Sequence, residues 1–295
     1  MPSSEFIALV DMLRTQRKPN QTVEQQRENE KKIVAMLPPP PGLQIETDDA
    51  QGVPVEWTTP PNLASDVVLF YLHGGGYCMG SIETHRGLVG RLAIAGGMKA
   101  LSVAYRLAPE HPFPAAVDDA VQAYRWLRKK LGDAARIVVA GDSAGGGLAI
   151  ATTLVLRDAG DVLPVALVCL SPSTDLAKEG ASFKSRAGID PLVTPEGSSV
   201  LADHYLAGAD PRTPLASPLY ADYAGLPPML ILVGTAEILH DDSVRLADRA
   251  REAGIEVELI VGEDMIHIWP FFAAIVPESR EAIDRIGEYL RRNVG

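Results

Sequence analysis

One serine in a glycine-rich turn is the first residue of this sequence that could carry covalent chemistry. A Gly-x-Ser-x-Gly motif places Ser143 between Gly141 and Gly145, directly after the apolar run Arg136–Ala140. A strand that turns this tightly into a helix strains the serine backbone and leaves its hydroxyl exposed above the sheet. The helix N-terminus that follows favours developing negative charge. We therefore predict that Ser143 is a nucleophile; a phosphate-binding P-loop is disfavoured because no lysine follows the glycines.

A second glycine-rich turn supplies groups that such a nucleophile would need. The residues His-Gly-Gly-Gly, His73 to Gly76, follow another apolar run, Val67–Leu72. Attack on a carbonyl creates an oxyanion, which must be stabilised by preorganised N–H donors. Glycines lack side chains, so their backbone can approach a substrate closely. We predict that the backbone N–H groups of Gly75, Gly76 and Ala144 form this oxyanion hole.

The general base must be one of the histidines in the chain, which are His73, His85, His111, His204, His240 and His267. His267 lies just past the last predicted strand, Glu256–Val261. In open α/β sheets the loops at the carboxyl ends of the strands gather around the functional site. The sequence therefore predicts His267 as the base, whereas we expect His73 to brace the glycine turn.

Three carboxylates lie close together in the stretch GTAEILHDDS and could orient His267. Glu237 falls in the loop directly after the apolar run Met229–Val233. Asp241 and Asp242 directly precede a helical run, where carboxylates cap free N–H groups and complement the helix dipole. Because capping accounts for the two aspartates but not for the glutamate, we favour Glu237, then Asp241, then Asp242. The chain order serine, acid, histidine is that of the α/β-hydrolases.

Short apolar runs alternate with helical stretches along most of the chain. The predicted strands are Leu43–Thr47, Val53–Thr58, Val67–Leu72, Leu101–Ala104, Arg136–Ala140, Val165–Leu170, Met229–Val233 and Glu256–Val261. The predicted helices between and after them are Thr84–Gly96, Pro114–Leu131, Ser143–Ala159, Asp242–Ala253 and Pro277–Arg292. Continuous apolar strands are typical of a parallel sheet that is covered on both faces. The alternation therefore predicts an α/β fold with a doubly wound, mostly parallel sheet of eight strands.

Two segments fall outside this alternation, and we expect them to form a helical cap. The proline run Pro38–Gly42 separates residues 1–42, predicted to hold two short helices, from a catalytic domain over residues 43–295. Residues 172–227 contain no strand-like run, and a structureless connection of that length is uncommon. We therefore predict a cap insertion over about residues 175–225, with a helix near Thr194–Ala207.

Composition and charge exclude several classes of function. The net charge of −11 disfavours binding to nucleic acid or to an anionic membrane surface, both of which need basic residues. No apolar run approaches the roughly 18 residues of a membrane-spanning helix. The two cysteines, Cys78 and Cys169, have neither metal-ligand spacing nor the number that a disulfide framework needs. With an N-terminal segment that does not resemble a signal peptide, these features lead us to expect a cytoplasmic protein.

Several longer motifs resemble those of one esterase family. The stretches HGGGYCMGSIETHR, YRLAPEHPFPAAVDDA, GDSAGG, SPSTDL, EILHDD and DMIHIW are together similar to the hormone-sensitive-lipase-like α/β-hydrolases, the bacterial family IV esterases. The resemblance covers nearly the whole chain. It implies an α/β-hydrolase fold with an N-terminal helical cap and a second inserted part, a Ser-His-acid triad and no cofactor. It also implies pairing of two copies through the last strand and the C-terminal segment.

The sequence departs from this family at the acid. Family members usually carry aspartate at the first acidic position of a D-P-L-x-D pattern, where this chain has Glu237, with Asp241 at the second. A glutamate can still fix the histidine tautomer, because the triad requires only a carboxylate at that place.

Taken together, these features predict a carboxylesterase for short- to medium-chain acyl esters. An amide or lactone hydrolase on the same triad, or a receptor that binds a small molecule without turnover, are the alternatives. The side chains we expect to bind substrate are Tyr77, Met79, Tyr205 and Ile268, and further candidates for the pocket lining are Phe183, Met265 and Trp269. We expect no metal, and the one partner we expect besides a second copy is a small-molecule ester.

Overall fold

The predicted strands assemble into one eight-stranded sheet in the computed structural model, which describes residues 1–16 and 21–294. The order across the sheet is β1-β2-β4-β3-β5-β6-β7-β8. These strands are β1 Gln44–Asp49, β2 Pro54–Thr59, β3 Val68–Leu72, β4 Lys99–Val103, β5 Ile137–Asp142, β6 Ala166–Leu170, β7 Met229–Gly234 and β8 Val257–Gly262. β1, β2 and β4 pair antiparallel, and every pairing from β4 to β8 is parallel. This is the expected α/β-hydrolase fold.

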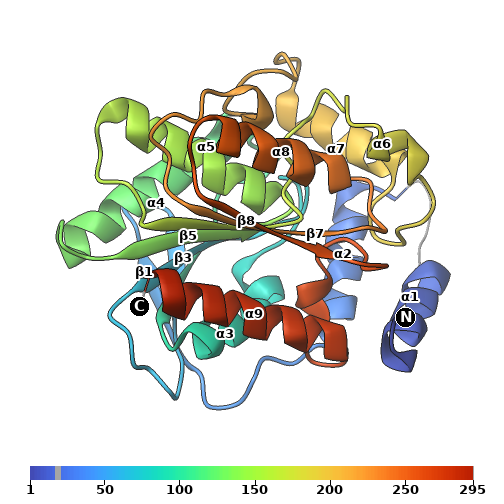
Figure 1. The fold of residues 1–295 in the computed structure, drawn as a ribbon, viewed down its shortest axis with the longest axis horizontal. Coiled ribbons are helices and arrows are strands. Elements are labelled where there is room, and N and C mark those ends of the chain that lie inside the picture. The colour runs from blue at the N-terminus through green and yellow to red at the C-terminus, as the bar shows by residue number, and fades with distance from the viewer. Residues whose placement is uncertain (17–20, 295) are drawn as a thin grey trace.

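Helices cover both faces of the sheet, which explains why its central strands are apolar throughout (Figure 1). On one face lie α4 (Ala115–Leu131), α5 (Ala144–Ala159) and α8 (His240–Glu252); on the other lie α3 (Ile82–Gly96) and α9 (Pro277–Val294). Every residue of β3, β5, β6 and β7 is buried. Alternate residues of these strands therefore contribute to two separate core clusters, one under each layer of helices.

Local signals set the ends of several helices. Ser81 and Thr84 form a capping box at the start of α3, and Gly97 ends that helix in the left-handed conformation. Thr194 caps α7 (Pro195–Leu206), the helix expected in the insertion. α8 begins at His240, two residues earlier than predicted, so Asp241 and Asp242 lie within its first turn.

Within the described residues, four α-helices belong to the two segments that we expected to form a cap. They are α1 (Ser4–Gln16), α2 (Val23–Val34), the short α6 (Ser182–Ser185) and α7. α1 buries Phe6, Leu9 and Leu13 in the same core cluster as α9. α2 lies against α3 and binds the glycine turn through side chains that are described below. The division into a cap of residues 1–42 and a catalytic domain of residues 43–295 stays a prediction.

Within the described part of the chain, no helix combines the length and the apolar character that crossing a membrane requires.

Candidate active site

The predicted residues Ser143, Glu237 and His267, together with Ser171, lie just after the ends of parallel strands. Ser143 follows β5, Ser171 follows β6, Glu237 follows β7 and His267 follows β8. Because these strands are parallel neighbours in the order β5-β6-β7-β8, their carboxyl ends meet at one edge of the sheet. Ligands of doubly wound sheets bind at this edge.

Ser143 occupies a strained turn between β5 and α5. Its backbone angles are φ 52° and ψ −121°, in a region that side-chain-bearing residues rarely adopt. Close approach of neighbouring backbone requires glycine on either side: a Cβ at Gly145 would lie 2.0 Å from the Leu72 carbonyl oxygen, and one at Gly141 would lie 2.6 Å from it. The Ser143 residue itself is partly exposed, whereas its neighbours are buried. This is the geometry expected of a nucleophile elbow.

The glycine turn presents unpaired N–H groups beside this serine. The Gly75 carbonyl accepts hydrogen bonds from the Cys78 and Met79 amides, and Gly75 and Gly76 have φ angles of 112° and 60°. Among the described residues, no acceptor pairs with the N–H groups of Gly75, Gly76 or Ala144. Free N–H donors at a partly exposed turn can stabilise an oxyanion, so the predicted oxyanion hole agrees with this geometry and stays a prediction.

A buried network under the glycine turn connects it to the serine motif. Asp142 accepts hydrogen bonds from the Tyr71 hydroxyl at 2.7 Å and the Gly74 amide at 3.0 Å, and its other oxygen lies 3.3 Å from His85 Nε2. Burial raises the pKa of Asp142, but His85 and these hydrogen bonds outweigh it and lower the pKa overall. The carboxylate therefore remains ionised and ties the two motifs together.

His73 braces this turn, as we expected. Burial lowers its pKa to about 4, so the ring is neutral. Its Nδ1 lies 2.8 Å from the Gly74 carbonyl and therefore donates, and the ring stacks on Tyr105 with centroids 4.2 Å apart.

His267 and Glu237 form a buried pair at the same edge. His267 Nδ1 and Glu237 Oε2 are 2.7 Å apart, and neither side chain is more than 3% exposed. Glu237 Oε1 accepts from the Gly234 amide at 2.6 Å and from the Ser171 hydroxyl at 2.8 Å. Burial lowers the pKa of His267, but the Glu237 carboxylate outweighs it and raises the pKa above its ordinary 6.5. The pair is therefore arranged to fix the imidazole tautomer and to stabilise an imidazolium.

Asp241 and Asp242 bind the insertion and not His267. Asp241 accepts from the Ser182 amide at 2.9 Å, and Asp242 accepts from the Thr174 and Asp175 amides at 2.8 and 2.9 Å. The expectation that they cap α8 was wrong: the N-cap position is Leu239, which carries no capping side chain, and the Asp241 amide in the first turn donates to the Ser182 hydroxyl at 3.0 Å. Burial raises the pKa of Asp242 to about 7, in spite of its two amide donors.

The residues expected to bind substrate differ in exposure. Met79 and Ile268 are partly exposed. Tyr77 and Tyr205 are buried and stack with ring centroids 3.7 Å apart, and neither hydroxyl has a hydrogen-bond partner among the described residues. Of the further candidates, Phe183 is partly exposed, whereas Met265 and Trp269 belong to the core cluster under α3 and α9. The substrate-binding roles stay predictions.

Four side chains that the sequence reasoning missed also reach this region. Ser171 and Asp190 bind the turn that carries His267, and Arg27 and Glu30 of α2 bind Cys78 and Gly80, just after the glycine turn. Only Ser171 had a signal in the sequence, because it directly follows a predicted strand at the edge where the site forms. The other three come from the cap segments, whose packing the sequence pattern does not define.

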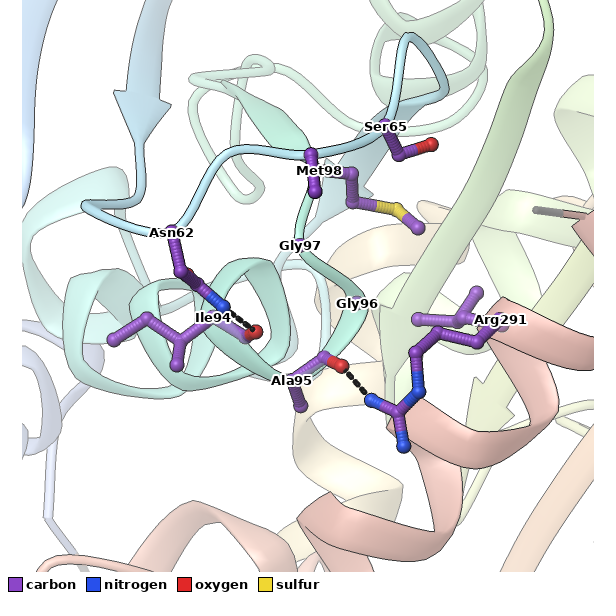
Figure 2. Close-up of a pocket in the computed structure, with 10 residues that line it drawn as sticks. Asn62, Ser65, Ile94, Ala95, Gly96, Gly97, Met98 and Arg291 are labelled. Atoms are coloured by element: carbon purple, nitrogen blue, oxygen red, sulfur yellow. Dashed lines mark hydrogen bonds between the residues drawn. The ribbon is translucent and has the colours of Figure 1, made fainter.

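Two surface hollows lie away from these residues. One, of about 370 Å³, lies at the end of α3 beside α9; Figure 2 shows its Asn62 and Arg291 side chains bound to the Ile94 and Ala95 carbonyls. The other, of about 590 Å³, runs along α4 beside Phe113. Neither is lined by Ser143, Glu237 or His267. No group of three or more His, Cys, Asp or Glu within residues 1–16 and 21–294 could hold a metal ion.

The arrangement can therefore carry out acyl transfer. It combines a strained serine, free N–H donors beside it, and a buried histidine oriented by a carboxylate. Nucleophilic catalysis on carbonyl compounds needs these parts and requires no other group.

Comparison with known proteins agrees with this chemistry. A family model described as the α/β-hydrolase fold matches residues 69–271. An acetyl-hydrolase of Streptomyces hygroscopicus is 47% identical over 240 residues, which cover 81% of this chain and 80% of that protein. An esterase of Acinetobacter venetianus is 34% identical over 258 residues, covering 87% and 85% of the two chains. The crystal structure of an esterase from the bacterial hormone-sensitive lipase family superimposes with a TM-score of 0.96, at 45% identity and full coverage of both chains.

Proposed function

Because the chain belongs to the bacterial hormone-sensitive-lipase-like esterases of the α/β-hydrolase family, we propose that it hydrolyses short- to medium-chain acyl esters through Ser143, His267 and Glu237. As a serine carboxylic-ester hydrolase it works through an acyl-enzyme. The similarity to an acetyl-hydrolase supports the short end of this chain-length range. The observation that carries the triad is the buried 2.7 Å contact between His267 Nδ1 and Glu237.

The mechanism follows from the roles of these groups. His267 Nε2 accepts the Ser143 hydroxyl proton as Oγ attacks the ester carbonyl carbon. The oxyanion that forms accepts hydrogen bonds from the N–H groups of Gly75, Gly76 and Ala144. When the tetrahedral intermediate collapses, the alcohol leaves with the proton from His267. Water then attacks the acyl-enzyme by the same steps, which releases the acid and restores the serine.

Substitution of the nucleophile tests the proposal. Ser143→Ala should lower kcat for p-nitrophenyl butyrate by a factor of about 10⁵–10⁶, because removing the nucleophile of such a triad has effects of that order. The thermal unfolding midpoint should stay near that of the wild type, since the hydroxyl makes no described hydrogen bond. Retention of most of the activity would rule out the scheme. A series of p-nitrophenyl esters from acetate to palmitate measures the acyl preference.

Two alternatives are separated by related measurements. An amide or lactone hydrolase would turn over a p-nitroanilide or a lactone faster than the matching ester. A receptor without turnover would not react with diethyl p-nitrophenyl phosphate, whereas an active esterase should be labelled at Ser143 alone. The buried His267–Glu237 pair favours the enzyme over the receptor.

We also propose a homodimer and a cytoplasmic location. β8 is an edge strand whose outer side is unpaired among the described strands, and its Val261 is exposed, which supports pairing through that strand. Cys78 and Cys169 are both free and buried, which agrees with a reducing compartment. Fractionation of cells that express the chain, followed by immunoblotting, checks the location, and recovery outside the cytoplasm would contradict it.

A further inference from the structure

The backbone turn that carries His267 is held by two side chains from distant parts of the chain. The His267 amide donates to Asp190 Oδ2 at 2.7 Å, and the next amide, that of Ile268, donates to Ser171 Oγ at 3.1 Å. Ile268 has φ 46° and ψ 38°, a left-handed conformation that is unusual for a β-branched residue. Such a conformation persists only where the surroundings impose it. The two side-chain acceptors are the contacts that impose it here.

Ser171 connects this turn to the triad acid. Its hydroxyl donates to Glu237 Oε1 at 2.8 Å while it accepts from Ile268, so a single buried oxygen binds both partners. Its own backbone has φ 44°, and its amide donates to the Leu232 carbonyl at the end of β7. The oxygen is therefore placed by the sheet, and it sets the distance between the acid and the histidine turn.

Asp190 approaches the same turn from the insertion. It is 1% exposed, and besides the His267 amide it accepts from the Leu192 and Val193 amides at 2.7 and 3.3 Å. Among the described residues no arginine or lysine forms an ion pair with it. A buried carboxylate without a cation is costly, and an amide or hydroxyl oxygen could accept the same bonds. Burial raises the pKa of Asp190 to about 6, with His267 lowering it and Glu237 raising it further.

We propose that Ser171 and Asp190 are positioning residues of the esterase reaction, which hold the His267 turn from the sheet and from the cap insertion, and that the Asp190 charge also stabilises the imidazolium. The proposal deepens the function proposed above and rests on it. Neither side chain touches the reacting atoms. Through Asp190, the insertion over residues 175–225 becomes part of the catalytic machinery and not only a cover for the site.

Removing either acceptor should lower kcat with little change in KM. We expect Asp190→Ala and Ser171→Ala each to lower kcat about 10- to 100-fold, because a displacement of about 1 Å at a catalytic group has effects of that order. KM should stay within about twofold, since neither residue contacts the ester. The rate of labelling of Ser143 by diethyl p-nitrophenyl phosphate should fall in parallel, because that reaction uses the same base.

The Asn variant separates the hydrogen bond from the charge. Asp190→Asn keeps an oxygen that can accept from the His267 amide, so kcat at its optimum should recover to within about fivefold of the wild type. The carboxylates that face His267 are Glu237, Asp190 and Asp142, and all three raise its pKa, against the effect of burial. Removing the Asp190 charge lowers that pKa. The acidic limb of kcat/KM reports the pKa of the base in the free enzyme. It should therefore move to lower pH in Asp190→Asn.

Controls match each substitution to an exposed residue nearby. Glu263→Gln removes an exposed carboxylate between β8 and His267, and Ser185→Ala removes an exposed hydroxyl in α6. Both should leave kcat and the pH profile unchanged. All rates are normalised to the folded fraction measured by circular dichroism, so that partial unfolding is not read as a loss of kcat.

Three outcomes would overturn the inference. They are a wild-type kcat in folded Asp190→Ala, a rise in KM with kcat unchanged, or an acidic limb of kcat/KM that stays at the wild-type pH in Asp190→Asn. If Asp190→Ala fails to fold, the pH profile of Asp190→Asn and the kcat of Ser171→Ala decide whether the inference holds. Activity that survives in Ser143→Ala would instead refute the proposed function, whereas an inactive Ser143→Ala beside a fully active Asp190→Ala would refute the inference alone.

Discussion

At the residue scale, the assignment of the acid depends on what each carboxylate already binds. Asp241 and Asp242 accept hydrogen bonds from insertion amides, whereas Glu237 reaches His267 Nδ1 and has its second oxygen satisfied by Gly234 and Ser171. These contacts favour Glu237 over Asp241 and Asp242 as the acid of the proposed triad.

A pair of matched variants tests this assignment. Glu237→Gln should lower kcat/KM by about 10³–10⁴-fold, because loss of the triad carboxylate leaves the wrong histidine tautomer. Asp241→Asn, which keeps an acceptor for the Ser182 amide, should lower it no more than about threefold. The measurement is initial-rate kinetics with p-nitrophenyl acetate. A larger loss in the aspartate variant would reverse the assignment.

At the element scale, helix α2 is attached to the loop that holds the proposed oxyanion donors Gly75 and Gly76. Arg27 donates to the Cys78 carbonyl at 2.7 Å and to the Ala108 carbonyl at 3.0 Å, and it pairs with Glu110. One turn further along α2, the Glu30 carboxylate accepts from the Gly80 amide at 3.0 Å. Helix α2 thus holds the segment that directly follows Gly75 and Gly76, at Cys78 and at Gly80.

Loosening this attachment should affect both stability and rate. Arg27→Ala should reduce the free energy of unfolding by about 1–3 kcal/mol, because hydrogen bonds from a charged donor to carbonyls are lost. The half-exposed Glu110 pair adds little to this. Arg27→Ala should also lower kcat a few-fold, because the loop that holds Gly75 and Gly76 becomes less ordered. Urea unfolding and steady-state kinetics provide the measurements.

The matched control for this helix is Lys31→Ala. Lys31 is 69% exposed and has only a long contact of 3.9 Å to Glu28. We expect it to change stability by less than about 0.5 kcal/mol, which is typical of surface substitutions. Equal effects of Arg27→Ala and Lys31→Ala would mean that the loop does not depend on α2.

At the scale of the whole molecule, the sheet ends in an open edge at β8. Val261 in this strand is 45% exposed, and the net charge of −11 would oppose association unless a specific surface pairs. α9 lies next to this part of the sheet, with Arg292 bound to Glu258 of β8 at 2.5 Å. Strand and helix together offer the surface that the proposed dimer would use.

Light scattering coupled to size exclusion tests the dimer. The wild type should elute with twice the mass of one chain, and Val261→Glu should shift it to the monomer, because two like charges would then meet across the strand pair. Val162→Glu is the control, since Val162 is exposed to 47% and lies away from β8. A wild-type monomer at micromolar concentration would exclude this interface.

Local signals in the sequence were sufficient for the fold class and for the main candidates of the site. Continuous apolar runs predict the central strands, because a strand buried on both faces must be apolar throughout. Gly141, Ser143 and Gly145 predict a strained turn, because only small residues fit where Cβ atoms would strike the Leu72 carbonyl. The start of α8 was misplaced by two residues, because its N-cap position, Leu239, carries no capping side chain.

The contacts between segments were decided only by the tertiary structure. The sequence by itself determined which residue types could attack, accept a proton and orient a base, since those are properties of side chains and of their place after strands. It could not choose firmly between Glu237 and Asp241, because the choice depends on Ser182, which comes from another segment and donates its amide to Asp241. Nor could it find Asp190, which lies 77 positions from His267. Hydrogen bonds of that range arise from how the cap packs on the sheet, and no periodicity along the chain encodes them.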